Sequence, residues 1–242
     1  MGERKRATDA AVKGRRHRGV FWVGIVMVLG GLGLLGYVGW QMYGTNVISQ
    51  QRHEQLTEEL RAQWADQAED GQGRGAAPAR VPSGQASALI RIPKFGDDYV
   101  VPVLEGVSDE VLASGYGHFE ETAGPGQRGN YALAAHRVTH GEPLKDMPTL
   151  RPGDEVIVET REATYTYVLD TDPNELIVTF EDYWVVGELP TNPEPGGVQP
   201  VQQPGQRLIT LTTCSELFHT DNRMIAFGHL VDREPRSAET SG

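Results

Sequence analysis

The chain has 242 residues, enough for one or two domains, and its formal net charge at pH 7 is -11. The charge is unevenly distributed: residues 1–19 carry seven Lys and Arg against two acidic residues, a net of +5, so the remainder carries -16. A basic head on an acidic body argues against a nucleic-acid partner, because the basic surface would then be expected on the folded part.

An apolar segment, residues 20–40, follows the basic head. It contains no charged side chain, and as a helix it would span roughly 31 Å, which matches the hydrocarbon core of a bilayer. Basic residues flank only its N-terminal side, since the next one beyond it is Arg52. The positive-inside bias therefore predicts a single-pass anchor in the cell membrane over 20–42, with 1–19 as a cytoplasmic tail and the rest extracellular. A cleaved signal peptide is the alternative, but its apolar core is usually only about 7–15 residues long.

Residues 43–87 are predicted to form a helical stalk and a flexible linker. Between Thr45 and Trp64, apolar residues recur near the helical period, so we expect a short helix leading away from the membrane. Residues 69–87 are rich in Gly, Ala, Pro and Ser and contain almost nothing that could enter a core, which is typical of a linker.

The folded domain is expected over residues 88–233, with 234–242 as a disordered tail. Its apolar runs are short, rich in β-branched and aromatic residues, and separated by Gly- and Pro-rich turns, which favours an all-β barrel or sandwich. Helical turns are expected at 108–115, where a serine precedes two acidic residues, and at 142–150. The strand-like runs are ALIRI, YVVPVL, NYALAAH, EVIVET, TYTYVL, LIVTF, RLITLTTC and RMIAFGHLV.

Neither a cofactor nor a metal ion is expected. Gly31, Gly33 and Gly36 match the G-x-G-x-x-G dinucleotide pattern, but they lie within the apolar span instead of between a strand and a helix. The acidic pairs at 97–98 and 120–121 lack the ligand spacing of a calcium-binding loop.

Cys214 is the only cysteine, so no internal disulfide can form, and the thiol is incidental, used for pairing between molecules, or reactive. It lies where the strand-like run 207–213 ends, and Arg223 begins the next run after a polar loop. If the two runs form a hairpin, Cys214 and Arg223 face each other at its open end. A guanidinium beside a partly exposed thiol favours the nucleophilic thiolate. The alternative is a small buried hydrophobe.

A cysteine nucleophile needs a proton partner, which is usually histidine. Two of the seven histidines lie in the predicted tail and stalk and can be set aside. His136 closes the run NYALAAH, as Cys214 closes its own run. The pattern alone does not decide among the remaining candidates, which are His118, His136, His140, His219 and His229.

Two segments resemble the active-site motifs of the sortase family. The run Thr210-Leu211-Thr212-Thr213-Cys214, with Arg223 after it, is similar to the T-L-x-T-C…R hairpin of sortases. Residues 129–137 (GNYALAAHR) are similar to the strand that ends in the family's catalytic histidine, and Tyr131 and Thr213 make the chain most similar to class E. The resemblance covers about residues 88–231. It implies a closed eight-stranded sortase-type barrel with short helices, preceded by one transmembrane helix and a stalk.

The resemblance also implies a cysteine transpeptidase and a role for each matching residue. Cys214 would attack the Thr–Gly bond of a C-terminal sorting signal of the LAXTG or LPXTG type and form a thioester. His136 would act as general acid and base, Arg223 would stabilise the oxyanion, and Tyr131 and Thr213 would contact the substrate. The implied partners are secreted proteins that carry the signal and an acceptor amine of a peptidoglycan precursor such as a lipid II-like molecule.

Two other functions are considered. An L,D-transpeptidase is also an exported β-rich cysteine acyltransferase, but its cysteine usually lies in Ser-x-Gly-Cys-x-Arg, whereas Cys214 follows two threonines. A non-catalytic, membrane-tethered binding barrel would bury Cys214 in its core and use Arg223 in a surface ion pair. Native-state thiol labelling separates the last case, because a buried structural cysteine does not react.

Tyr131 has a second interpretation. In a regular strand, Tyr131, Leu133 and Ala135 share one face, while His136 lies on the other. Tyr131 would then reach the substrate only where the strand bends or meets the barrel rim, and would otherwise fill the core.

Overall fold

The computed structural model of the chain describes residues 3–40, 44–69, 81–215 and 221–236. The chain divides into two compact units, Met1–Gly44 and Thr45–Gly242. Most of the linker predicted over 69–87 lies outside the described residues, and so does His219. The tail predicted over 234–242 is described only as far as residue 236.

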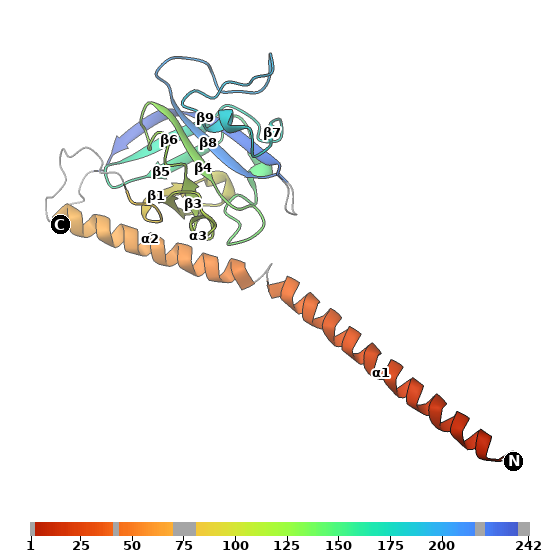
Figure 1. Cartoon of the computed structure of the whole chain (residues 1–242). Helices are drawn as coiled ribbons and strands as arrows, with labels where there is room; N and C mark the ends of the chain where they lie inside the picture. The colour runs from red at the N-terminus through yellow and green to blue at the C-terminus, as the bar shows by residue number, and fades with distance from the viewer. Residues whose placement is uncertain (1–2, 41–43, 70–80, 216–220, 237–242) are drawn as a thin grey trace. The chain divides into compact units, whose positions relative to one another are not determined.

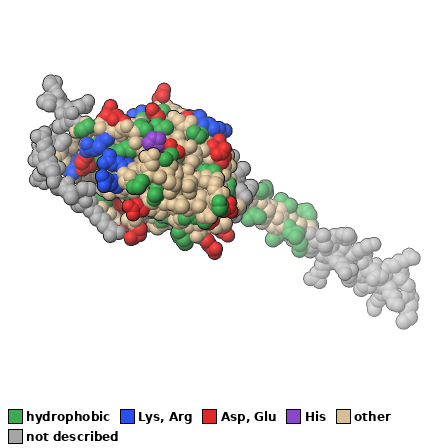
Figure 2. All heavy atoms as spheres, turned by 90° about the horizontal axis from the view of Figure 1, so that it is seen from above, with side chains coloured by type: hydrophobic (Ala, Val, Ile, Leu, Met, Phe, Trp, Pro, Cys, Tyr) green, Lys and Arg blue, Asp and Glu red, His purple; other side chains and the backbone are tan. Residues whose placement is uncertain are grey.

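The first unit contains helix α1, Glu3–Gly39. Its segment Phe21–Gly39 is long and apolar enough to cross a membrane, with a mean hydropathy of 2.1 and no buried residue in its most apolar window. Met27 is 74% exposed and Leu35 is 70% exposed, and Figure 2 shows apolar side chains over the described part of this helix. Such an exposed apolar surface fits a lipid surrounding. The helix is therefore a candidate membrane anchor.

The second unit is built on a closed barrel of eight strands, with a ninth strand outside it (Figure 1). The order around the barrel is β6-β5-β1-β2-β3-β4-β8-β9, and the pairing of β6 with β9 closes it, so that no barrel edge is exposed. The predicted eight-stranded fold is confirmed. The strands are β1 (Ala86–Arg91), β2 (Val101–Glu105), β3 (Tyr116–His118), β4 (Gly129–Ala134), β5 (Glu155–Glu159), β6 (Ala163–Leu169), β7 (Ile177–Val178), β8 (Arg207–Cys214) and β9 (Arg223–Pro235).

Short helices occupy the connections. Helix α3 (Asp109–Leu112) begins as predicted after Ser108, whose hydroxyl accepts a hydrogen bond from the Val111 N–H at 3.4 Å. The predicted turn at 142–150 is in part a short 3-10 helix, η3 (Met147–Thr149). Two further 3-10 helices are η2 (Pro93–Phe95) and η4 (Tyr183–Val186).

The wall formed by β4, β8 and β9 has a hydrophobic core on each side. Tyr131 and Leu133 of β4 point into the barrel, where the main core lies. On the outer side, Val185 of η4 and Phe227 of β9 belong to a smaller cluster, which the connection between β7 and β8 helps to cover. Because successive residues of a strand point to opposite faces, β9 contributes Met224 and Ala226 to the main core and Ile225 and Phe227 to the smaller one.

Helix α2 spans Thr45–Glu69, longer than predicted, and belongs to the same unit as the barrel. It contacts β1 and β2. The predicted division into a stalk and linker (43–87) and a catalytic domain (88–233) stays a prediction. The part of the predicted stalk that forms α2 packs on the barrel. The contacting side chains recur every three or four residues and so share one helical face; they are Asn46, Ser49, His53, Thr57, Leu60, Trp64 and Gln67.

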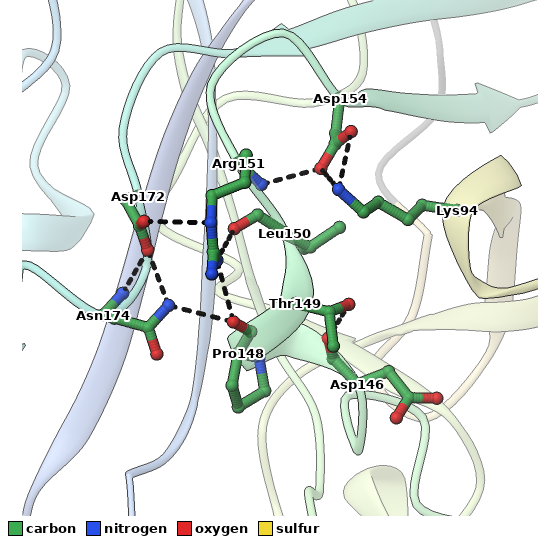
Figure 3. Close-up of polar contacts among 9 residues, drawn as sticks. All are labelled: Lys94, Asp146, Pro148, Thr149, Leu150, Arg151, Asp154, Asp172 and Asn174. Carbon is green, nitrogen blue, oxygen red and sulfur yellow. Dashed lines mark hydrogen bonds and ion pairs between the residues drawn. The ribbon is translucent and has the colours of Figure 1, made fainter.

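A polar network fixes the end of the long connection between β4 and β5 (Figure 3). Asp154 accepts a hydrogen bond from the Arg151 N–H at 2.7 Å and pairs with Lys94 of η2 at 2.8 Å. The Arg151 side chain pairs with Asp172 at 3.4 Å. Exposed pairs of this kind add little stability individually, but together they join the connection after β4 to the connection between β6 and β7.

Candidate active site

The ends of three neighbouring strands carry Cys214 on β8, Arg223 on β9 and, two residues beyond the last residue of β4, His136. Cys214 ends β8, and Arg223, the first residue of β9, is its antiparallel partner, so the predicted hairpin is confirmed. Strand β4 runs parallel to β8 with Ala134 beside Thr212. Continued by two residues, this register puts His136 beside Cys214, and neighbouring strands are usually about 4.8 Å apart. The fold therefore brings the three residue types together.

Two hydrogen bonds hold the end of β4 against β8. The Ala135 N–H donates to the Thr212 carbonyl at 3.2 Å, and the Thr213 hydroxyl donates to the Ala135 carbonyl at 2.7 Å. Thr213 is only 2% exposed, so water does not compete for this bond. Thr213 thus fixes the backbone directly before His136.

Strand alternation assigns His136 and Cys214 to the outer side of the wall. Their chain neighbours Ala135 and Thr213 are buried, Ala135 in the barrel core. Cys214 is a free, half-buried thiol, and His136 and Arg223 are also half-buried. A thiol in such a setting is accessible to a substrate, whereas one inside the barrel would be inert.

Arg223 contacts Phe180 and Asn222. Its guanidinium carbon lies 3.6 Å from the ring centroid of Phe180, and its Nη1 donates to the Asn222 carbonyl at 2.8 Å. Phe180, on the connection after β7, is 56% exposed. A cation–π contact of this kind restrains a group that stays charged at any working pH. No sequence pattern predicts the role of Phe180, because the contact joins segments far apart in the chain.

Arg137 anchors the backbone that carries the thiol. Its Nη1 donates to the Cys214 carbonyl at 3.4 Å, and also to the Ser215 carbonyl. Sequence reasoning assigned this residue no role, although its place directly after His136 in the motif was an available signal.

Two other candidate histidines are bound to carboxylates in the barrel wall. His118 of β3 is buried, with Nδ1 2.7 Å from Glu105 and Nε2 3.0 Å from Thr122. His229 lies 2.8 Å from Asp170 and pairs with the beginning of β8, far along the strand from its cysteine end. Neither is at the level of Cys214.

His140 is a neighbour of His136 instead of a separate candidate. The two rings stack with centroids 4.7 Å apart and 29° between their planes. Burial lowers the pKa of His140 below its ordinary value, against an opposing effect of Asp109. Among the described candidates, His136 is the one that continues the β4 register to Cys214.

Tyr131 lies on the inner side of the wall. Its side chain is 1% exposed and its ring centroid is 4.8 Å from that of His118. Burial, with a contribution from the Glu105 carboxylate, raises the pKa of Tyr131 well above its ordinary value. The hydroxyl has no hydrogen-bond partner among the described residues. The structure therefore brings Tyr131 into the core and not to the level of Cys214.

The fold and the site together define a β-barrel protein with a cysteine and an arginine paired at the ends of two strands and a histidine just beyond the end of the neighbouring strand. A family model of the sortase domain matches residues 90–231, and the chain belongs to the sortase family.

Named relatives agree with this assignment. The chain is similar to Sortase SrtE1 of Streptomyces coelicolor, with 36% identity over 222 residues; the match covers 89% of this chain and 58% of that protein. It is similar to the solved structure of sortase E from Streptomyces avermitilis (37% identity, TM-score 0.56, 64% of this chain and 93% of that chain). It is also similar to sortase E1 of S. coelicolor, solved with a tripeptide in the active site (35% identity, TM-score 0.55, 67% and 97%). The predicted similarity to class E sortases is confirmed.

Proposed function

We propose that the chain is a cysteine transpeptidase that cleaves the Thr–Gly bond of a cell-wall sorting signal and transfers the acyl group to an amine. The observation that carries the proposal is the pairing of Cys214 with Arg223 at the ends of β8 and β9, with His136 two residues after the end of the neighbouring strand β4, in a member of the sortase family. Amide cleavage needs a nucleophile, an acid for the leaving amine and a fixed donor where negative charge develops, and these residues supply the three functions.

In the first step, the Cys214 thiolate attacks the threonine carbonyl carbon and a C–S bond forms. The carbonyl oxygen gains negative charge, which Arg223 stabilises with its rigidly spaced N–H donors. His136 then protonates the glycine nitrogen, the C–N bond breaks, and a thioester remains on Cys214. The contact with Phe180 supports this role, because it restrains the guanidinium before the charge develops.

In the second step, an amine attacks the thioester. His136, now neutral, takes the proton of the incoming nitrogen, a new amide bond forms, and the Cys214 thiolate leaves. We assign the acceptor to the amine of a peptidoglycan precursor such as a lipid II-like molecule, and the donor to secreted proteins with a LAXTG- or LPXTG-type signal. The family assignment supports a sorting-signal substrate in general.

The proposed place of this reaction is the outer surface of the cell membrane. Helix α1 supplies a candidate anchor, and the one-sided cluster of Lys and Arg in residues 1–19 favours a cytoplasmic N-terminus. In this topology residues 45–242 are extracellular, where both the secreted protein and the cell-wall precursor are found.

Thr213 and Tyr131 are the remaining predicted substrate contacts. For Thr213, we propose that its effect on the substrate is indirect, through the bond to the Ala135 carbonyl. For Tyr131, substrate contact stays a prediction, and its burial and its place on the inner side favour a packing role.

The test is product analysis with the purified full-length chain in detergent. A Leu-Ala-Glu-Thr-Gly peptide and its Leu-Pro counterpart are incubated with triglycine, and mass spectrometry follows the exchanged product. The wild-type chain is expected to form it and Cys214→Ala is not. Product from the alanine variant, or none from a folded wild-type chain with either peptide, would reject the proposal. Native-state labelling of Cys214 with iodoacetamide separates an inactive binding barrel, whose thiol would not react.

A further inference from the structure

Helix α2 holds the loop that follows His136. The Asn46 side chain accepts a hydrogen bond from the Gly141 N–H at 3.0 Å and donates one to Glu142 Oε1 at 2.8 Å. One asparagine therefore uses both ends of its amide to hold two consecutive loop residues. These contacts lie within the same compact unit.

The loop lies so close to α2 that a side chain at Gly141 would not fit. A Cβ there would be 2.7 Å from His53 Cε1 and 3.5 Å from Ser49 Cβ. Ser49 and His53 are themselves buried, at 4% and 6% exposure. Asn46, Ser49 and His53 follow one another at helical spacing, so a single face of α2 makes the whole contact.

The backbone of this loop is in an unfavourable conformation that needs support. His140, Gly141 and Glu142 all have positive φ angles, of 54°, 80° and 52°. Left-handed backbone is easy for glycine but unfavourable for the two residues beside it, so it persists only where surrounding contacts determine it. The contacts from Asn46 act on Gly141 and Glu142, at the centre and the end of this segment.

The loop conformation sets the place of His140, whose ring stacks on that of His136 at 4.7 Å. Burial lowers the pKa of His140, which favours the uncharged form of the ring that stacks on His136. A chain of contacts thus runs from α2 through the 140–142 segment to His136.

We infer that α2 is a positioning element for the active site: Asn46 holds the 140–142 loop so that His140 packs against the His136 ring and fixes its orientation. The inference rests on the proposed role of His136 as general acid and base. Helix α2 follows the anchor-containing unit directly in sequence. In this proposal it supports catalysis and is not only a spacer between the anchor and the barrel. Displacing α2 would therefore disorder His136.

The test compares two substitutions on the same face of α2 in the full-length chain in detergent. Asn46→Ala removes both bonds to the loop. Gln67→Ala, the matched control, removes the bond that Gln67 accepts from Arg161 at 2.7 Å near the other end of the helix. A third variant, Gly141→Ala, changes the loop instead of the helix, because a Cβ at position 141 would collide with His53.

Asn46→Ala is expected to lower kcat about tenfold with KM changed less than about twofold, and Gly141→Ala to do the same, because a misplaced acid–base group costs rate more than binding. Gln67→Ala is expected to leave kcat within about twofold. If Asn46→Ala has wild-type kcat, or if both helix variants lose activity together with melting temperature, α2 does not position the site.

An activity-independent readout separates this inference from the proposed function. In ¹H–¹³C spectra of histidine-labelled protein, with the His136 signal assigned by His136→Gln, Asn46→Ala is expected to shift the His136 resonance and Gln67→Ala is not. An unmoved His136 resonance would overturn the positioning role even if the enzyme is active. A shifted resonance in a chain that forms no transpeptidation product would instead reject the proposed reaction and keep the structural link.

Discussion

The two sides of the wall formed by β4, β8 and β9 have different roles: the inner side packs in the core, and the outer side carries the candidate active site. On the inner side, alternate residues such as Tyr131 and Leu133 are buried in the main core. On the outer side, His136, Cys214 and Arg223 are half-buried at the strand ends. The inner side stabilises the barrel mainly by packing apolar side chains. The outer side carries the three polar side chains proposed for catalysis, which must lie close to one another. A shift of one residue in register would exchange the two sides, so the core that fixes the register also places the site.

The outer side should be sensitive to small chemical changes that preserve charge. Arg223→Lys keeps the positive charge but loses the planar fork and most of the contact with Phe180. We expect kcat/KM to fall about 100- to 1,000-fold, the usual loss when an oxyanion donor is removed, with melting temperature nearly unchanged. The control is Arg91→Lys, which alters an exposed pair with Glu159. Equal activity of the Arg223 variant would mean that a positive charge alone suffices there.

Acid should lower the free energy of unfolding of the second unit through His53, which is buried between α2 and the barrel. Burial lowers the pKa of His53 on α2 from 6.5 to about 4. The unfolded state therefore binds a proton more readily, so this stabilisation is complete above pH 6.5, falls with decreasing pH, and is lost below about 4. The total is about 3 kcal/mol.

The measurement is urea denaturation of residues 45–242 between pH 7 and pH 4. His53→Gln, which cannot be protonated, should show a shallower decline in the free energy of unfolding than the wild type. Parallel curves for the two proteins would show that His53 is not a buried neutral histidine.

Thr213 is expected to affect both sides. Its side chain is buried, and its hydroxyl donates a hydrogen bond to the carbonyl of Ala135, the residue before His136. Thr213→Val keeps the volume but leaves the Ala135 carbonyl without this donor. The expected loss of stability is about 1–3 kcal/mol, accompanied by a several-fold lower kcat. Thermal denaturation and steady-state kinetics measure the two effects. A stability loss without any change in kcat would show that Thr213 contributes to packing and not to the position of His136.

The smallest effect is expected at Tyr131. Its hydroxyl is buried and has no partner among the described residues, so Tyr131→Phe should change stability by less than about 1 kcal/mol. The ratio of kcat/KM for the Leu-Ala and Leu-Pro peptides should also stay the same. A severalfold change in that ratio would support the substrate contact that the family resemblance predicts, and would mean that the two sides of the wall are not separate in function.

Local patterns predicted the hairpin and seven of the eight barrel strands, since both depend on alternation and on a loop between consecutive segments. They missed β3, which is only three residues long, and the predicted run 176–180 is β7, which lies outside the barrel. The side chain of Tyr131 also lies on the face that alternation predicts. Phe180, by contrast, reaches Arg223 from a connection between distant strands, and Asn46 reaches Gly141 from a segment read as a stalk. Polar contacts of this kind follow from tertiary packing, which a single sequence does not reveal.

The most direct test of the central claim is the identity of the acylated residue. Full-length protein is mixed with the Leu-Ala-Glu-Thr-Gly peptide, quenched in acid within milliseconds to seconds, digested, and analysed by mass spectrometry. We predict one thioester adduct, which carries the peptide up to its threonine and lies on Cys214, the only thiol of the chain. Product formation with unmodified Cys214, or with the acyl group on another residue, would contradict it.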